Sequence, residues 1–220
     1  MIKQLFTIIV FTILLGCLAW SCTNNAKRIK HVELVSTAEG DCTCPHCRLL
    51  IQPYGDFSNE RAKVVAEELE KNLDKYVKDL AVTEVKVLPA KPLTEDLIND
   101  AKTRYRADKI IKSIKENHHD VIIVLTHQDI SCTLRGKADW GVQGLSIMSN
   151  HYVCVVSDFR IKNKKRDLWK VAAHEFFHAY CSLPHCPNDD PNCLMQDAKG
   201  HPNYTTKEYL CKNCTEKCNI

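Results

Sequence analysis

A His-Glu-x-x-His string, His174 to His178, constrains this chain more than any other feature, because it lies in a stretch of helical composition from Asp167 to Tyr180. Residues four apart share one face of an α-helix, so the two imidazoles can reach a single ion. Zinc accepts such nitrogens at about 2 Å, and a third protein ligand leaves one position for water. The string therefore predicts a helix that carries two ligands of a zinc site.

Glu175 is the neighbour of His174 and is expected at the flank of the ion. There a carboxylate can accept a proton from a zinc-bound water, whose pKa the metal lowers to about 7. The apolar residues Val171, Phe176 and Phe177 are expected to pack the opposite side of the helix. The string predicts metal-assisted hydrolysis with Glu175 as general base, and a surface helix with satisfied histidines is the alternative.

The composition is that of a globular protein, with 220 residues, of which 45% are hydrophobic and 26% charged. This length suits one domain. A formal net charge of +3 is too small to indicate nucleic acid, and no block of Lys and Arg is interleaved with aromatic residues. We expect a monomer that acts on a peptide or protein and binds no nucleic acid.

Residues 1–22 read as a lipoprotein-type signal peptide. Lys3 provides the charge, and the apolar run from Leu5 to Gly16 is shorter than the roughly 20 residues of a membrane span. Cys17 and Cys22 both follow small residues, so either fits a bacterial lipoprotein cleavage site. We favour Cys22 because residues 23–30 then form a polar tether, with the folded domain at 31–220. A plain uncleaved anchor is the alternative, and both place the protein outside the cytoplasm, at the membrane surface of the bacterial cell envelope.

The rest of the chain alternates between strand and helix patterns, separated by turns. We expect a helix starting at Ser58, a long helix over Thr94–Ile114, the helix of the His-Glu-x-x-His string, and a short helix at Thr206–Leu210. A polar segment, Thr126–Gly144, precedes the last strand. The order predicts a mixed α/β or α+β sheet with helices packed on it. The strands are expected at His31–Val35, Leu49–Ile51, Val82–Leu88, Val121–Leu125 and Tyr152–Val156.

Downstream of the helix, His185-Cys186 is followed by Cys193-Leu194-Met195 and by a Cys-x-x-Cys pair. With these residues the chain resembles the archaemetzincins (archaelysins), a branch of the metzincin zinc peptidases. The resemblance implies a metzincin-like zincin domain with a mixed twisted sheet, an active-site helix and a cysteine-rich C-terminal subdomain. It also implies peptide-bond hydrolysis, with aminopeptidase and endopeptidase action both open.

The resemblance assigns roles to individual residues. His174, His178 and His185 match the three ligands of the catalytic zinc, Glu175 the general base, and Met195 the methionine beneath the site. A second, structural zinc is implied at the four cysteines Cys186, Cys193, Cys211 and Cys214. Supporting matches lie upstream at Ile51–Gly55, Arg104–Asp108 and Val153–Arg160.

One departure concerns the third histidine. The family places it six residues after the second, with glycine three after the second; here these positions hold Pro184 and Cys181. Because Leu-Pro-His-Cys is retained, we expect that His185 is the ligand and that the loop is one residue longer. Cys181 is then expected to be a free thiol near the site.

Other outcomes remain open for that loop. The third ligand is alternatively Asp189, Asp190 or Glu208, or it is missing. Without it, the chain is a catalytically silent zinc-binding envelope protein of the same fold.

The four C-terminal cysteines have the two-and-two clustering of a Cys₄ zinc site, and two disulfides are the alternative in an exported protein. Cys218 is a spare that is expected to pair with the N-terminal cysteines.

Cys44-Pro45-His46-Cys47 reproduces the string of periplasmic thiol oxidases, which makes a thiol-disulfide protein using Cys44 and Cys47 a further alternative. That chemistry needs a long helix after the first cysteine, and Pro53 and Gly55 would end it. A disulfide or small metal site within Cys42, Cys44 and Cys47 is favoured instead. Near the methionine, His201 and Tyr204 are candidates for substrate contact.

Overall fold

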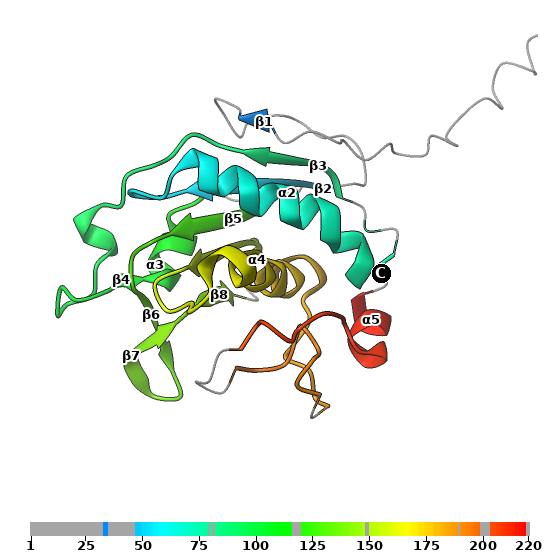
Figure 1. Cartoon of the computed structure of the whole chain (residues 1–220). Coiled ribbons are helices and arrows are strands. Elements are labelled where there is room, and N and C mark those ends of the chain that lie inside the picture. Colours follow the sequence, from blue (N-terminus) through cyan, green and yellow to red (C-terminus); the bar gives the residue numbers. More distant parts are fainter. Residues whose placement is uncertain are drawn as a thin grey trace, which may run out of the picture.

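In the computed structural model, the residues described are 33–34, 47–78, 80, 82–115, 120–147, 150–188, 190–198 and 203–218. Their main feature is a six-stranded sheet of order β1-β3-β2-β5-β9-β8 (Figure 1). Neighbouring strands are parallel except β8, which runs antiparallel along the edge of β9. The strands are β1 (Glu33–Leu34), β2 (Cys47–Pro53), β3 (Val82–Val87), β5 (Asp120–Thr126), β8 (Gly144–Ile147) and β9 (Asn150–Ser157).

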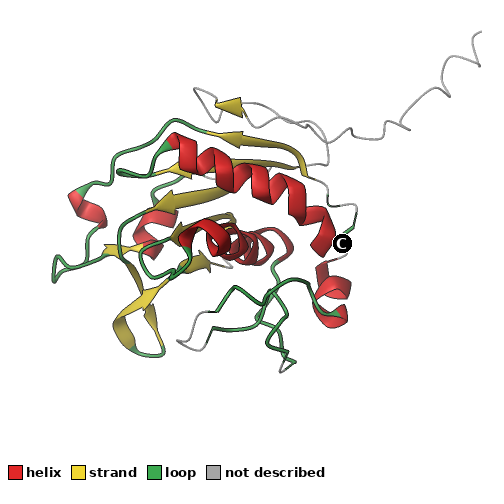
Figure 2. Cartoon of the chain, in the orientation of Figure 1, coloured by secondary structure: helices red, strands yellow, loops and turns green. Residues whose placement is uncertain are grey.

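Helices cover both faces of this sheet (Figure 2). α2 (Asn59–Tyr76) and α4 (Lys164–Cys181) lie side by side on one face, and α3 (Ala107–Lys112) packs on the other. Every residue of β5 is buried, as its continuous apolar run predicts for a central strand. The expected helix start at Ser58 is confirmed, because the Ser58 hydroxyl accepts a hydrogen bond from the Arg61 amide at 3.2 Å.

The expected long helix over Thr94–Ile114 is wrong. Only Glu95–Leu97 (a 3₁₀ turn, η1) and α3 are helical, and β4 (Tyr105–Arg106) lies between them. The Asn99 side-chain oxygen accepts hydrogen bonds from the amides of Thr103 and Arg104 at 2.8 and 3.2 Å. Such local side-chain bonds close a turn and compete with the helix, which is why the apolar spacing misled the prediction.

Two further expectations need correction. The polar segment Thr126–Gly144 contains β6 (Ile130–Leu134) and β7 (Lys137–Val142), which form a three-stranded sheet with β4. The predicted helix Thr206–Leu210 is instead the end of a turn followed by an isolated β-bridge between Tyr209 and Cys193, beside which the Leu194 amide donates to the Tyr209 carbonyl at 2.7 Å. The C-terminal helix of the described chain comes later, as α5 (Lys212–Cys218).

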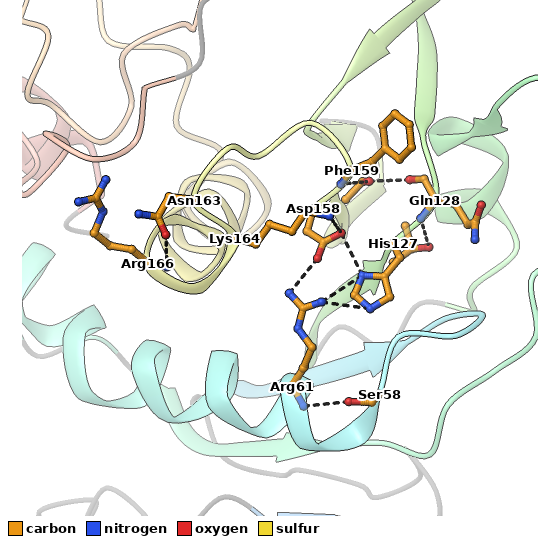
Figure 3. A network of polar contacts seen from close by, with 11 residues as sticks. Ser58, Arg61, His127, Gln128, Asp158, Phe159, Asn163, Lys164 and Arg166 are labelled. Atoms are coloured by element: carbon orange, nitrogen blue, oxygen red, sulfur yellow. Dashed lines mark hydrogen bonds and ion pairs between the residues drawn. The ribbon is translucent and has the colours of Figure 1, made fainter.

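A buried carboxylate fixes the start of α4 against the sheet (Figure 3). The Asp158 side chain, which follows β9, is fully buried. It accepts bonds from Arg61 of α2 at 2.8 Å and from Lys164 of α4 at 3.4 Å, and it contacts His127 after β5 at 2.9 Å. Ion pairs and hydrogen bonds offset the cost of burying such a charge. Here they join the C-terminal ends of β5 and β9 to α2 and α4.

The matched segments upstream converge on a second carboxylate. Asp129 accepts from Arg104 at 2.8 Å and from Arg160 at 2.7 and 2.8 Å. A bidentate guanidinium pair fixes direction as well as distance. The two arginines therefore hold the small sheet against the end of β9. No helix in the described part of the chain is both long and apolar enough to cross a bilayer.

Candidate metal centre

Three histidines meet at the C-terminal end of α4. The ligand nitrogens of His174, His178 and His185 all lie within 4.8 Å of one another. The Nε2 atoms of His174 and His178 are 3.0 Å apart, and the His185 ring lies 4.8 Å from the His178 ring. Nitrogens at these separations suit an ion with bonds of about 2.0–2.1 Å, so this donor set fits zinc.

The backbone sets the tautomer of both helical histidines. His174 Nδ1 lies 2.7 Å from the Leu194 carbonyl oxygen, and His178 Nδ1 contacts the Leu183 carbonyl oxygen. An Nδ1–H that donates to a carbonyl leaves the Nε2 lone pair for a metal. Burial lowers the pKa of all three imidazoles, for His178 to about 4. Each histidine is therefore neutral at pH 7, which is the ligand form.

The turn after α4 explains the displaced histidine. Ser182 has a positive φ of 51°, and the Leu183 amide donates back to the Phe177 carbonyl at 3.3 Å, a Schellman-type helix end. Relative to the family pattern, both the left-handed residue and the third histidine have moved by one position. Ser182 lies three residues before His185, as the family glycine lies before its histidine. The helix has gained the extra residue, and the turn itself has kept its length.

Glu175 lies beside β8, the antiparallel edge strand. Ser146 Oγ is 3.1 Å from Glu175 Oε2 and 2.9 Å from the Glu175 carbonyl oxygen. A Cβ at Gly144 would collide with the Glu175 carboxylate, so only glycine leaves room for it. Burial raises the pKa of Glu175 to about 8, and a bound cation nearby would oppose that shift.

The predicted methionine segment lies under the histidines. Met195 and Leu194 are fully buried, and the Cys186 amide donates to the Met195 carbonyl at 2.8 Å. Tyr204 packs edge-on against His174 with ring centroids 5.8 Å apart. Tyr204 was a sequence candidate for substrate contact, and the structure places it beside the first ligand. His201 lies outside the described residues.

The four C-terminal cysteines form one cluster rather than two disulfides. Their sulfur atoms lie within 4.8 Å of one another, and all four thiols are free. Cys186 Sγ and Cys211 Sγ are 3.6 Å apart, and Cys193 Sγ and Cys214 Sγ are 3.9 Å apart. Four soft donors at such separations fit a structural zinc with Zn–S bonds of about 2.3 Å.

Sequence patterns gave no indication of Lys207, which is 4% exposed. Its ammonium donates to the carbonyls of Cys193 and Gln196, each at 3.2 Å. Burial lowers its pKa. Four thiolates around a divalent ion leave a net negative charge, which a buried ammonium would offset. Ser146 and Gly144 were missed as well, because their roles depend on which strand lies along α4.

Two expectations about the remaining cysteines are wrong. Cys181 is no free thiol, and Cys218 does not pair with the N-terminal cysteines: the two form a disulfide with each other, joining α4 to α5. Cys42 and Cys44 lie outside the described residues, as do Cys17, Cys22 and the tether, so the predictions on them stay predictions.

The alternative third ligands are not part of the histidine group. Asp190 accepts from the Tyr209 hydroxyl at 2.7 Å and from the Asn192 amide at 3.0 Å. Glu208 is also absent from the described groups that could hold a metal. Asp189 lies outside the described residues. Among the residues described, His185 alone joins the two helical histidines.

Comparisons with known proteins find similar solved structures. No family model matches the chain, and no curated protein does. An archaemetzincin from Archaeoglobus fulgidus, solved with malonate, aligns with a TM-score of 0.56 at 23% identity, over 77% of this chain and 99% of that one.

Two other solved structures agree. An archaemetzincin from Methanopyrus kandleri has a TM-score of 0.58 at 19% identity, over 79% of this chain and 93% of its own. A zinc-dependent peptidase from Methanocorpusculum labreanum has a TM-score of 0.57 at 18% identity, over 78% of this chain and 100% of its own. The expected resemblance and the fold class are thus confirmed, and this chain has the archaemetzincin fold.

Proposed function

We propose that this chain is a zinc-dependent metallopeptidase that hydrolyses peptide bonds with Glu175 as general base. One observation carries the proposal: three neutral imidazoles converge, and the buried carboxylate of Glu175 directly follows the first of them on α4. The structural neighbours, described as archaemetzincins and as a zinc-dependent peptidase, support it. The lengthened helix favours an active site over the silent alternative, because it leaves His185 with the other ligands.

The residues divide the chemistry between them. His174, His178 and His185 would hold zinc, which supplies a Lewis acid that polarises the peptide carbonyl and lowers the pKa of water. Glu175 accepts a proton from the attacking water at its carboxylate and donates it to the departing amine. Ser146 and Gly144 keep the carboxylate in place, and Tyr204 packs the first imidazole. Cys186, Cys193, Cys211 and Cys214 would hold a second zinc that stabilises the C-terminal segment.

The decisive variant is Glu175→Gln, which removes the base and keeps the shape of the side chain. We expect hydrolysis of a peptide library to fall by about 10²- to 10⁴-fold, while zinc content stays at about two per chain. Glu67→Gln, on the exposed side of α2, is the matched control and should keep full activity. His185→Ala should retain about one zinc.

Two results would contradict this proposal. Equal turnover in Glu175→Gln and the native chain would exclude Glu175 as the base. Two bound zinc ions without hydrolysis of any peptide would instead establish the silent zinc-binding protein.

We also propose that the protein is exported and held at the bacterial cell envelope by a lipid on Cys22, with Cys17 as the alternative. The apolar run followed by small residues and cysteine supports this.

A further inference from the structure

A cavity of about 210 Å³ lies beside the first turns of α4. It is smaller than the roughly 300–1,000 Å³ of pockets for drug-sized ligands, so it suits a single side chain or chain end. The loop before α4, the first turn of the helix and the segment around Tyr204 form its walls.

Two lining residues connect the cavity with the candidate metal centre. Tyr204 lines it and also packs against His174. Gln143 lines it and directly precedes Gly144, which faces the Glu175 carboxylate. Arg166 precedes His174 by eight residues, which is about 12 Å along a helix. This distance corresponds to three or four residues of an extended substrate peptide, at about 3.3 Å each. Fewer residues are needed when a long substrate side chain reaches into the cavity.

Hydrogen-bond donors dominate the lining. Arg166 donates through Nε to Asp167 at 3.1 Å and through one terminal nitrogen to the Thr205 hydroxyl. The other terminal nitrogen has no bond within the described residues. Lys162 likewise forms no salt bridge with any described group.

Two amides add to these donors. The side-chain oxygens of Asn163 and Asn203 accept from backbone amides at 3.3 and 3.2 Å. Their NH₂ groups are thereby left as donors at the cavity wall. The acidic residue of the lining, Asp167, already accepts from Arg166 and, at 3.1 Å, from Thr205.

The side chains divide around this turn of the helix. Lys164 reaches Asp158 on the far side, whereas Asn163 and Arg166 lie on the other (Figure 3). The cavity therefore has two cations, Lys162 and Arg166, and a single anion that is already bonded.

We infer that this cavity binds a carboxylate of the substrate, and so makes the enzyme selective for peptides with an acidic residue or a free C-terminus near the cleaved bond. Cationic and amide donors that lack partners are the groups that recognise a carboxylate. The inference rests on the proposed peptidase function.

The test uses the zinc-loaded chain and peptides that are acetylated and amidated. Each pair differs only by Glu or Gln at one position, scanned on both sides of the cleaved bond, and a further pair differs only by a free or amidated C-terminus. The ratio of kcat/KM within each pair is measured. Because charge-assisted hydrogen bonds are stronger than neutral ones, we expect about a tenfold preference for the carboxylate in one of the pairs. The pair that responds separates a side chain from a chain end.

Variants then locate the effect. Lys162→Gln and Arg166→Gln should each move that ratio towards one, with little change for the uncharged peptide. Lys165→Gln removes the same charge from the same helix turn outside the cavity, and should leave the ratio unchanged. A ratio near one in every native pair would overturn the inference, as would an equal loss in Lys165→Gln.

Binding separates this inference from the proposed function. The same pairs are titrated into zinc-loaded Glu175→Gln by calorimetry. A preference in Kd without hydrolysis by the native chain would sustain the cavity and refute the peptidase. Hydrolysis with no preference in any pair would refute the cavity alone.

Discussion

At the scale of single residues, Ser182 shows how the chain tolerates a departure from the family pattern. It occupies a left-handed conformation that residues other than Gly, Asn and Asp seldom adopt. Its position three residues before His185 lets the turn deliver that imidazole to the site. The sequence predicted that the ligand was kept but placed the extra residue in the loop, because helix length cannot be read to one residue.

Ser182→Gly is expected to raise the free energy of unfolding by up to about 1 kcal/mol. Glycine relieves a left-handed strain of about 1–2 kcal/mol, partly offset by its greater freedom in the unfolded chain. Urea unfolding of the zinc-loaded protein measures the change. Ser113→Gly is the control, since Ser113 has a φ of −75° and gains nothing from glycine. A lower midpoint for Ser182→Gly would show that the turn is not strained.

The candidate ligand residues could be predicted from the sequence, and the residues that support them could not. Histidine, glutamate and cysteine spacings report on local geometry, so His174, Glu175 and the Cys₄ set were recognised before any fold. Gly144 and Ser146 matter only because β8 pairs with β9 and lies along α4. That pairing is long-range and leaves no local pattern.

At the scale of elements, the strand patterns predicted the structure more reliably than the helical spacing of apolar residues over Thr94–Ile114. Leu97 and Ile110 do belong to one apolar cluster, as a single helix face would require, but Leu97 lies in a 3₁₀ turn and Ile110 in α3. Helical spacing reports burial on one side and not a continuous helix. The Cys181–Cys218 link was equally invisible, because cysteine spacing alone does not determine disulfide connectivity.

Removing this disulfide is expected to lower the free energy of unfolding by about 2–4 kcal/mol, since it closes a loop with a sequence separation of 37 residues. The comparison is between the native chain and Cys218→Ala in denaturant, each with and without a phosphine reductant. Reduction should bring the native chain to the stability of Cys218→Ala and leave that variant unchanged. An equal effect of reductant on both proteins would show that it acts elsewhere.

At the scale of the whole molecule, the mixed sheet with helices packed on it followed from the order of its elements, and β5 followed from its apolar run. Which face each helix covers did not follow. The networks at Asp158 and Asp129 join residues far apart in sequence, and their partners emerge only once the strands are ordered. Membrane attachment is a separate property, which the sequence alone supports.

When the full chain is expressed in a bacterium, we expect membrane-associated protein whose mature N-terminus is a lipid-bearing Cys22. Intact mass and fractionation of membrane and soluble protein measure this. Cys22→Ala should remain unprocessed, whereas Cys17→Ala should behave as the native chain. Processing lost only in Cys17→Ala would show that Cys17 carries the lipid. An unmodified N-terminus in the native chain and in both variants would refute the lipid anchor.

The short run Cys193-Leu194-Met195 belongs to both candidate metal sites at once. Cys193 is a member of the sulfur cluster, the Leu194 carbonyl orients His174, and the Met195 carbonyl holds the amide of Cys186. Whatever free energy one ion gains by ordering this run is available to the other, and such coupling is reciprocal by thermodynamic necessity. Loss of zinc from the four cysteines would therefore weaken the affinity of the three histidines for zinc.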